Sequence, residues 1–306
     1  MASAAESLDG ENTVQTAAKA EVTDGVSMLF DGGETVGVMG AGIAVFSGTK
    51  EQNNGIGALS TVKSVEIGMT GENTSIDGVV LGGLAIDDTN PTDDGKPTGQ
   101  PVSTKNASST VEGSATFTAD SGKLNRLNFA AFVGQENQAP NDPNADKPDV
   151  RDHLDALAYA VDHQNVALIG GGLASGIHDD EENDGIAHVA TANINLIGDV
   201  VVGEEDNKAN VYGGGIAANG AKATVESANI LVADNAQVYG DIYGGGIAQD
   251  GEYAGDPEYY NKSESVVEKT VITLAGGHVY GNLYAGGLVS EARDNSPQSS
   301  SVVEDS

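Results

Sequence analysis

The sequence predicts an all-β fold, a single-stranded parallel β-helix (β-solenoid) of about seven glycine-rich coils. Two observations lead to this prediction: a glycine motif recurs along the 306 residues, and an alternating apolar pattern precedes the copies of the motif. The clearest copies are residues 211–217 (VYGGGIA), 242–248 (IYGGGIA) and 283–289 (LYAGGLV). Fainter copies occupy residues 38–44, 79–85, 127–133 and 168–174. The starts of successive copies are 31–48 residues apart. Repeats of this length are typical of arrays in which each unit packs on its neighbours.

The segment before each glycine motif predicts a strand, because its apolar residues alternate with polar ones at a period of two. The pattern is clearest at Val189, Ala192, Ile194 and Leu196, at Val225, Ala228, Ile230 and Val232, and at Val267, Thr270, Ile272 and Leu274. Residues 115–119 follow it one residue out of phase with their glycine motif. Residues 154–161 favour a helix by propensity alone, but their place in the repeat predicts a strand. Asp, Asn and Gly then form a turn, since these residues accept turn conformations.

Aligning the motifs predicts columns of like residues, which would be buried when coils stack at about 4.8 Å. One apolar column precedes the glycines: Val38, Val79, Leu127, Leu168, Val211, Ile242 and Leu283. A second follows them: Ile43, Leu84, Phe132, Leu173, Ile216, Ile247 and Leu288. The third glycine position holds Gly42, Gly83, Gly172, Gly215, Gly246 and Gly287, with Ala131 in the remaining copy. A side chain there would clash, either because the backbone has a positive φ or because neighbouring layers touch.

The alternative fold is a β-propeller, because seven units also fit seven blades. A blade needs four strands, whereas each of these units shows two or three. The motifs that start at residues 211 and 242 are only 31 residues apart, which is short for four strands and their connections. The parallel β-helix is therefore favoured.

The chain divides into a repeat domain at 14–289 and two tails, 1–13 and 290–306, which are rich in Ser, Ala and acidic residues and are expected to be disordered. Variable acidic loops are expected at about the same point of each repeat, and in a solenoid such insertions emerge on one side. These loops cover about 45–61, 86–110, 134–153, 175–188, 218–224 and 249–266.

The V-Y-G-G-G-I-A repeats, the V-x-x-A-x-I-x-V strands before them and the absence of cysteine resemble the repetitive passenger regions of bacterial autotransporters and related cell-surface adhesin-like proteins. The resemblance covers about residues 14–289 and is strongest over 189–289. It implies a right-handed parallel β-helix displayed outside the bacterial cell. The first residues lack the basic start and apolar core of a signal peptide, and residues 296–306 carry no sorting signal. The resemblance alone implies surface display.

The composition excludes several classes of function. Asp and Glu number 46 against 14 Lys and Arg, and the net charge of −32 repels nucleic acid and anionic membrane surfaces. No window approaches the ~20 apolar residues of a membrane-spanning helix, so we expect neither nucleic-acid binding nor direct membrane insertion. The glycine triplets lack the Lys-Ser/Thr that a phosphate loop needs. Absent cysteines and scattered histidines exclude cysteine catalysis and zinc clusters.

Two sets of residues are candidate binding sites. Asp179, Asp180, Glu182 and Asp184 belong to the densest acidic cluster and are candidates for weak calcium binding, since calcium prefers hard oxygen ligands. No other cofactor is expected. Tyr212, Tyr243 and Tyr284, with Tyr239 and Tyr280, would form ladders in the last units. Such ladders are either a surface for stacking sugars or aromatic stacks that support the coils, and the second interpretation is favoured.

The predicted function is a non-enzymatic bacterial cell-surface or secreted module for adhesion or structural display, with acidic loops along one edge as its contact surface. Its partners would be host glycans or surface proteins. A polysaccharide lyase or hydrolase on the same fold is an alternative, because paired carboxylates can hydrolyse glycosides. We assign no catalytic residue, since none of the three arginines, Arg126, Arg151 and Arg293, lies beside an acidic pair on a predicted strand. The third hypothesis is that the chain is an inert spacer stalk.

Overall fold

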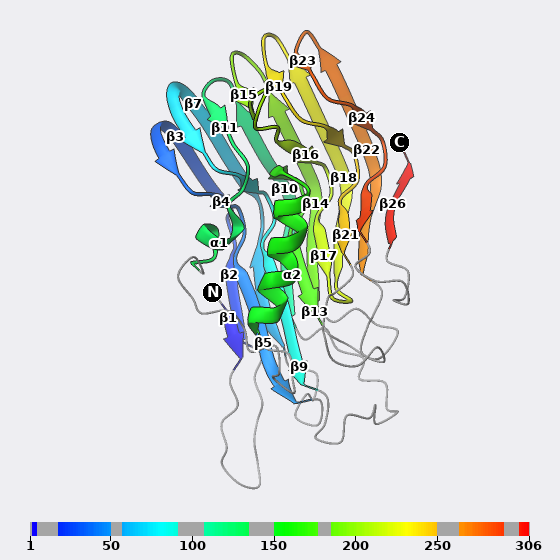
Figure 1. Cartoon of the computed structure of the whole chain (residues 1–306). Coiled ribbons are helices and arrows are strands. Elements are labelled where there is room, and N and C mark those ends of the chain that lie inside the picture. Colours follow the sequence, from blue (N-terminus) through cyan, green and yellow to red (C-terminus); the bar gives the residue numbers. More distant parts are fainter. Residues whose placement is uncertain are drawn as a thin grey trace, which may run out of the picture.

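The computed structural model describes residues 2–4, 18–49, 57–90, 107–134, 150–176, 185–249, 263–290 and 300–305. In these ranges the chain forms three parallel sheets that run side by side through the molecule (Figure 1). Sheet A contains β1 (Ala2–Ala4), β5 (Ile43–Thr49), β9 (Leu84–Asn90), β13 (Leu173–Gly176), β17 (Ile216–Ala218), β21 (Ile247–Gln249) and β25 (Leu288–Ser290). Sheet C contains β4 (Val38–Met39), β8 (Val79–Val80), β12 (Val166–Ile169), β16 (Asn210–Tyr212), β20 (Ile242–Tyr243) and β24 (Leu283–Tyr284).

Sheet B holds the longest strands. It contains β2 (Ala18–Val22), β3 (Val26–Thr35), β6 (Ala58–Val62), β7 (Val65–Ile76), β10 (Ala107–Ala119), β11 (Lys123–Leu124), β14 (Gly185–Leu196), β15 (Val201–Val202), β18 (Lys222–Ala233), β19 (Gln237–Val238), β22 (Glu264–Ala275), β23 (His278–Val279) and β26 (Ser300–Asp305). Two helices accompany the sheets, α1 (Phe129–Phe132) and α2 (Val150–His163).

Each strand pairs in parallel with its counterpart in the next repeat. On sheet B, for example, Ile194 of β14 is in register with Ile230 of β18, which is in register with Ile272 of β22. The structure therefore confirms an all-β fold of parallel sheets built from repeats. The β-propeller alternative is wrong for this part of the chain, because propeller blades are antiparallel sheets and these strands pair between repeats.

A coil, as we use the term, is a pass through sheet B, then sheet C, then sheet A. The described residues contain six coils rather than about seven, because β8 pairs directly with β12, with Val79 in register with Leu168. The third and fourth copies of the motif thus belong to one coil. The third copy, residues 127–133, forms α1 instead of a strand, and the side chain of Asn128 caps it by accepting a hydrogen bond from the Ala131 amide.

The prediction of a strand at residues 154–161 is wrong, since these residues lie in α2. Leu154, Leu157, Ala160 and Val161 have the i, i+3, i+6, i+7 spacing of one helix face. Asp152 in the first turn and His163 in the last match the helix dipole. The helix lies across the outer face of sheets A and C (Figure 1), so its local propensity prevails over its place in the repeat.

The two apolar columns lie on opposite faces of the wall that sheets C and A form. Val79, Leu168, Val211 and Ile242 are buried in the interior against sheet B, as predicted. The second column points outward, where Leu84, Leu173, Ile216 and Ile247 pack with Leu157 of α2 in a separate cluster. Leu127 and Phe132 also belong to this outer cluster and not to the sheets. The prediction that both columns are buried by stacking alone is therefore corrected: α2 covers the second.

The third glycines confirm the prediction that neighbouring layers touch. None of them has a positive φ, so the other explanation does not apply. A Cβ atom on Gly215 would lie 2.5 Å from the Gly172 carbonyl oxygen and 2.9 Å from the Ala223 Cβ on sheet B. The chain at the start of sheet A approaches sheet B so closely here that the residue opposite each alanine or serine of sheet B must be glycine.

A column of serine and alanine on sheet B completes this contact. Its members are Ser60, Ser109, Ala187, Ala223, Ser265 and Ser301, each two residues before a buried or half-buried valine. Ser109, Ser265 and Ser301 donate their hydroxyls at 3.0 Å to the carbonyl oxygens of Gly42, Gly215 and Gly246. The sequence analysis did not predict this column, although its fixed spacing of two residues before a valine was a signal that could have revealed it.

The array extends beyond the expected range of 14–289 at both ends. β1 adds a strand to sheet A beside β5, and β26 adds one to sheet B beside β22. Parts of the segments 1–13 and 290–306 are therefore ordered, in β1, at Ser290 of β25 and in β26, whereas residues 1, 5–13, 291–299 and 306 lie outside the described residues.

Candidate functional site

The strands of sheet A end, and the sheet B strands that follow them in the chain begin, at one end of the molecule, where β5 and β9 finish (Figure 1). In the fourth coil, β17 and β18 are joined by a tight turn of Asn219, Gly220 and Ala221. Asn219 and Gly220 have φ angles of 54° and 87°, and the Ala221 amide donates to the Ala218 carbonyl at 3.1 Å. The other connections include residues 50–56, 91–106, 177–184, 250–262 and 291–299, which lie outside the described residues. We call this end of the molecule the A-to-B edge.

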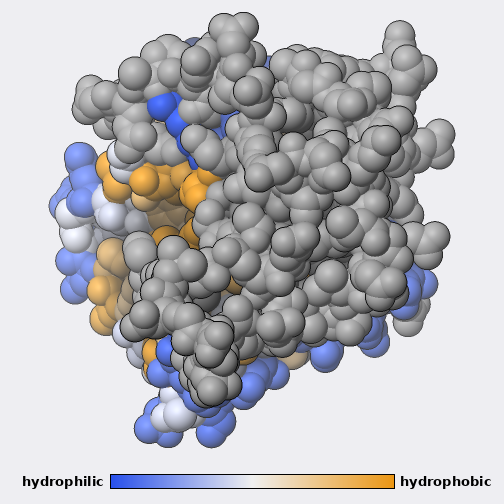
Figure 2. Space-filling view, turned by 90° about the horizontal axis from the view of Figure 1, so that it is seen from below, coloured by the Kyte–Doolittle hydropathy of each residue, from blue (hydrophilic) through white to orange (hydrophobic). Residues whose placement is uncertain are grey.

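The A-to-B edge matches the predicted loops with corrections. β5 and β9 extend into the predicted loops at about 45–61 and 86–110. The predicted loop at 134–153 belongs elsewhere, because it lies between β11 and β12 and its last residues begin α2. Figure 2 views the molecule from this end and shows an apolar area on the N-terminal side, at the left, among hydrophilic described residues.

The chain leaves and re-enters the sheets at neighbouring points of this edge. A Cβ atom on Gly176, the last residue of β13, would lie 3.1 Å from the amide nitrogen of Gly185, the first residue of β14. The segment 177–184 therefore bridges two strand ends that already touch. It contains the calcium candidates Asp179, Asp180, Glu182 and Asp184, which lie outside the described residues.

The tyrosines form two stacks along the coils. The ring centroids of Tyr212 and Tyr243 are 4.7 Å apart with an interplanar angle of 3°, and those of Tyr243 and Tyr284 are 4.7 Å apart at 13°. Tyr239 and Tyr280 stack at 4.4 Å and 11°. The predicted ladders therefore exist. The stack of Tyr212, Tyr243 and Tyr284 lies on the outer side of the wall, and the stack of Tyr239 and Tyr280 directly follows β19 and β23 of sheet B.

This geometry favours structural support over sugar stacking. A sugar stacks on a free ring face, but the facing rings of each stack cover one another. Tyr212 is fully buried in the cluster that includes α2. Among the three candidates, Tyr284 ends its stack and has a face that no tyrosine covers.

The stack predicts a measurable alkaline instability. Burial, followed by Asp241 and Tyr284, raises the pKa of Tyr243 to about 12, whereas an unfolded tyrosine has a pKa of about 10. Below pH 10 both states keep the proton, and the stabilising contribution is fully present. It is lost as the pH rises from 10 through 12, because only the unfolded chain ionises there. We expect Tyr243→Phe to shift alkaline unfolding, followed by circular dichroism, to higher pH.

The control is Tyr159→Phe, on the exposed face of α2, which should leave the alkaline unfolding curve unchanged. An absorbance titration of tyrosinate in both variants identifies the late-ionising phenol. Equal unfolding curves for Tyr243→Phe and the unaltered chain would contradict the proposed role of the stack.

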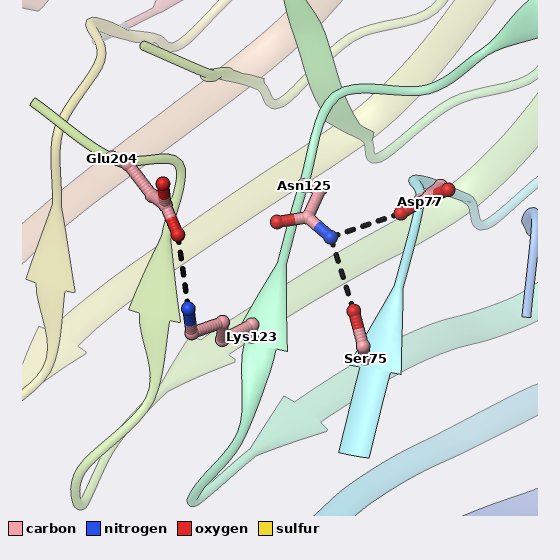
Figure 3. A network of polar contacts seen from close by, with 5 residues as sticks. All are labelled: Ser75, Asp77, Lys123, Asn125 and Glu204. Atoms are coloured by element: carbon pink, nitrogen blue, oxygen red, sulfur yellow. Dashed lines mark hydrogen bonds and ion pairs between the residues drawn. The ribbon is translucent and has the colours of Figure 1, made fainter. Parts of the chain in front are cut away.

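A polar network lies at the end of the strands opposite the A-to-B edge (Figure 3). Asn125, after β11, donates its amide to Ser75 Oγ at 3.0 Å and to Asp77 Oδ1 at 2.9 Å. Lys123 Nζ lies 2.9 Å from Glu204 Oε1, and both side chains are more than half exposed. Since exposed ion pairs contribute little, the network ties three neighbouring coils together and offers no evident chemistry.

His153, Arg126 and Arg151 each have a partner in the fold. His153 of α2 is buried, and its Nδ1 lies 3.0 Å from Ser175 Oγ, which also accepts from the Asn219 amide at 3.3 Å. Arg126 donates to the Lys208 carbonyl at 2.6 Å, and Arg151 lies 3.8 Å from Asp155. Within the described ranges, no three His, Cys, Asp or Glu side chains form a group that could hold a metal ion.

Comparisons of the chain with protein-family models, with curated proteins and with solved structures gave no match. In the described part of the chain, neither helix has the length and apolar character to span a membrane.

Proposed function

We propose that this chain is a β-helix module without enzymatic activity, whose A-to-B edge displays loops that bind a partner. The observation that carries the proposal is the uneven use of this edge. One coil crosses it with the tight turn at 219–221, which suffices for the fold, while other coils insert longer segments at the same place. Rigid scaffolds with variable loops at one edge commonly host recognition.

The sheet arrangement supports the β-helix interpretation. Each coil passes once through the three sheets, and like residues are in register from coil to coil, as Val211, Ile242 and Leu283 are on sheet C. Such a body depends on stacking rather than on one central core. We further propose that it acts outside the bacterial cell on host glycans or surface proteins, a placement that rests on the resemblance of its repeats.

The loop segment 177–184 gives the sharpest test. Because Gly176 and Gly185 already touch, an Asn-Gly-Ala turn copied from 219–221 should replace it without disturbing the strands. The unaltered chain and this variant are incubated with a panel of polysaccharides and host glycoproteins. We expect the chain to be retained without cleaving the ligand, the variant to lose at least tenfold in affinity, and both to have the same unfolding midpoint.

Glu204→Gln, at the opposite end of the strands, is the matched control and should be retained like the unaltered chain. The corresponding replacement of 88–106, between the positions in register with Gly176 and Gly185, extends the test to a second loop. Full retention by both loop variants would contradict the assignment of this edge. New reducing or unsaturated ends would identify a hydrolase or lyase instead, and the absence of both signals would favour a spacer. Repeating the unfolding measurement in millimolar calcium tests the acidic cluster, which the 177–184 variant lacks.

A further inference from the structure

The end of the array at the sixth coil has an open part. β26 pairs with the first half of β22, from Glu264 to Lys269. Among the described residues, no strand pairs on the outer side of the second half of β22, of β23 or of β24. Leu274 and Leu283 are 51% and 47% exposed there, whereas Val232 and Ile242, their counterparts one coil earlier, are buried. This end therefore presents interior residues and free strand edges, which invite pairing with another chain.

The first coil is open on the opposite side and carries the same columns. β3 and β4 pair only with β7 and β8 among the described strands. Phe30 is in register with Met69, and the same column leads through Val232 to Leu274. The column of Val38 leads in the same way to Leu283. A first coil placed on the sixth would continue the interior of the array, apolar residue on apolar residue.

The position of β26 coincides with that of β2 in such an arrangement. Val22 of β2 and Val303 of β26 belong to one column, which passes through Val62, Val111, Val189, Val225 and Val267. Lys19 of β2 would stand over Glu264, in the column in which Lys222 already lies 3.1 Å from Glu264. Charge as well as register thus fits β2 to this place.

We propose that the sixth coil is a docking surface for the first coil of a second copy of this chain, and that β26 blocks it. Docking displaces β26 from β22. It also displaces β1 of the incoming copy from β5 of that copy, because β25 of the receiving copy occupies the same place beside β5. The contact joins different surfaces of the two copies, so it repeats from copy to copy without closing and builds a linear assembly. The net charge of −32 opposes the contact, and salt weakens that repulsion.

The test compares two neighbouring residues of β26 in the full chain. Val303 packs against the interior, so Val303→Asp releases β26, whereas Val302 is 40% exposed and Val302→Asp is the matched control. Molar mass is measured by sedimentation over a hundredfold range of concentration at low and high salt. We expect the unaltered chain and Val302→Asp to have the mass of one copy, and Val303→Asp to form multiples that increase with concentration and salt.

Two further variants identify the surface. Val302→Pro removes a backbone donor that faces β22, as the Ser300 amide two residues earlier does, and should reproduce the assembly. Adding Leu283→Arg to Val303→Asp should return the mass to one copy, because it places a charge in the contact. Val303→Asp and Val302→Pro chains that keep the mass of one copy at every concentration would overturn the proposal, as would assemblies that Leu283→Arg leaves intact. Assembly of the unaltered chain to the same extent would overturn the blocking role of β26.

Discussion

Replacing Gly246 by alanine is expected to reduce the free energy of unfolding by about 3 kcal/mol, the upper part of the usual range for overpacking. A Cβ atom there would overlap the Gly215 carbonyl oxygen and lie 2.7 Å from the Gly215 amide nitrogen. That oxygen accepts from the Ile247 amide at 2.9 Å and from the Ser265 hydroxyl at 3.0 Å. The layers must separate to admit the methyl group, and both hydrogen bonds then weaken. Chemical denaturation measures the loss.

Two other glycines calibrate this prediction. Gly286 lies one coil further on, and a Cβ atom there would meet nothing within 4 Å, so Gly286→Ala should change stability by less than about 0.5 kcal/mol. At Gly42, in the first coil, the nearest obstacle is the Ser60 hydroxyl, which can rotate away. Gly42→Ala should therefore have an intermediate cost. Equal losses for Gly246→Ala and Gly286→Ala would show that contact between layers does not explain the glycines.

The sequence predicts the strands of sheet B well because the period-two pattern is a local property of neighbouring residues. Val189, Ala192, Ile194 and Leu196 are all buried in β14, as the alternation indicates. Residues 115–119 also behave as a regular strand, with Phe117 in register with Ile67 and Ile194. Their phase differs only from that of the third glycine motif, residues 127–133, which forms α1 and belongs to no sheet.

The sequence pattern does not show which face of a wall an apolar column occupies. Val211 points inward and Tyr212 outward, and after the glycine triplet Ile216 again points outward. That relation depends on the path of the backbone through Gly213, Gly214 and Gly215, which apolar periodicity does not describe. For the same reason, the sequence did not predict that the outer column needs a cover or that residues 150–163 provide it.

The candidate site is only partly predictable. The positions of the tyrosines follow from the repeat. That stacking covers the facing rings follows from a spacing of 4.7 Å, and that Tyr212 is inaccessible follows from its burial, and both are tertiary facts. The position of the connections at one edge also follows from the repeat. The tight turn at 219–221, which shows that longer connections are not required by the fold, becomes informative only when the strand ends are known.

Truncating Leu157 to alanine is expected to cost about 2–5 kcal/mol of unfolding free energy, as for other fully buried leucines. Leu157 is the fully buried leucine of α2, in the same cluster as Leu173, Tyr212 and Ile216. Its removal leaves a cavity between the helix and the wall. If α2 is the cover of the outer column, loosening it should also lower the pKa of Tyr212, which burial raises. Denaturation and tyrosinate absorbance follow the two effects.

Tyr159→Ala is the matched control for the helix, because Tyr159 lies two residues further on with 41% of its surface exposed and stacks on His163 instead of the wall. It removes a larger side chain from the same helix, yet should cost less than Leu157→Ala, since 41% of the Tyr159 surface is already in water and its removal leaves no closed cavity between the helix and the sheets. If Tyr159→Ala destabilised the chain as much as Leu157→Ala, the loss would reflect the helix itself and not its contact with the sheets. A small effect of both substitutions would mean that the stability of the array depends on stacking between coils and not on α2.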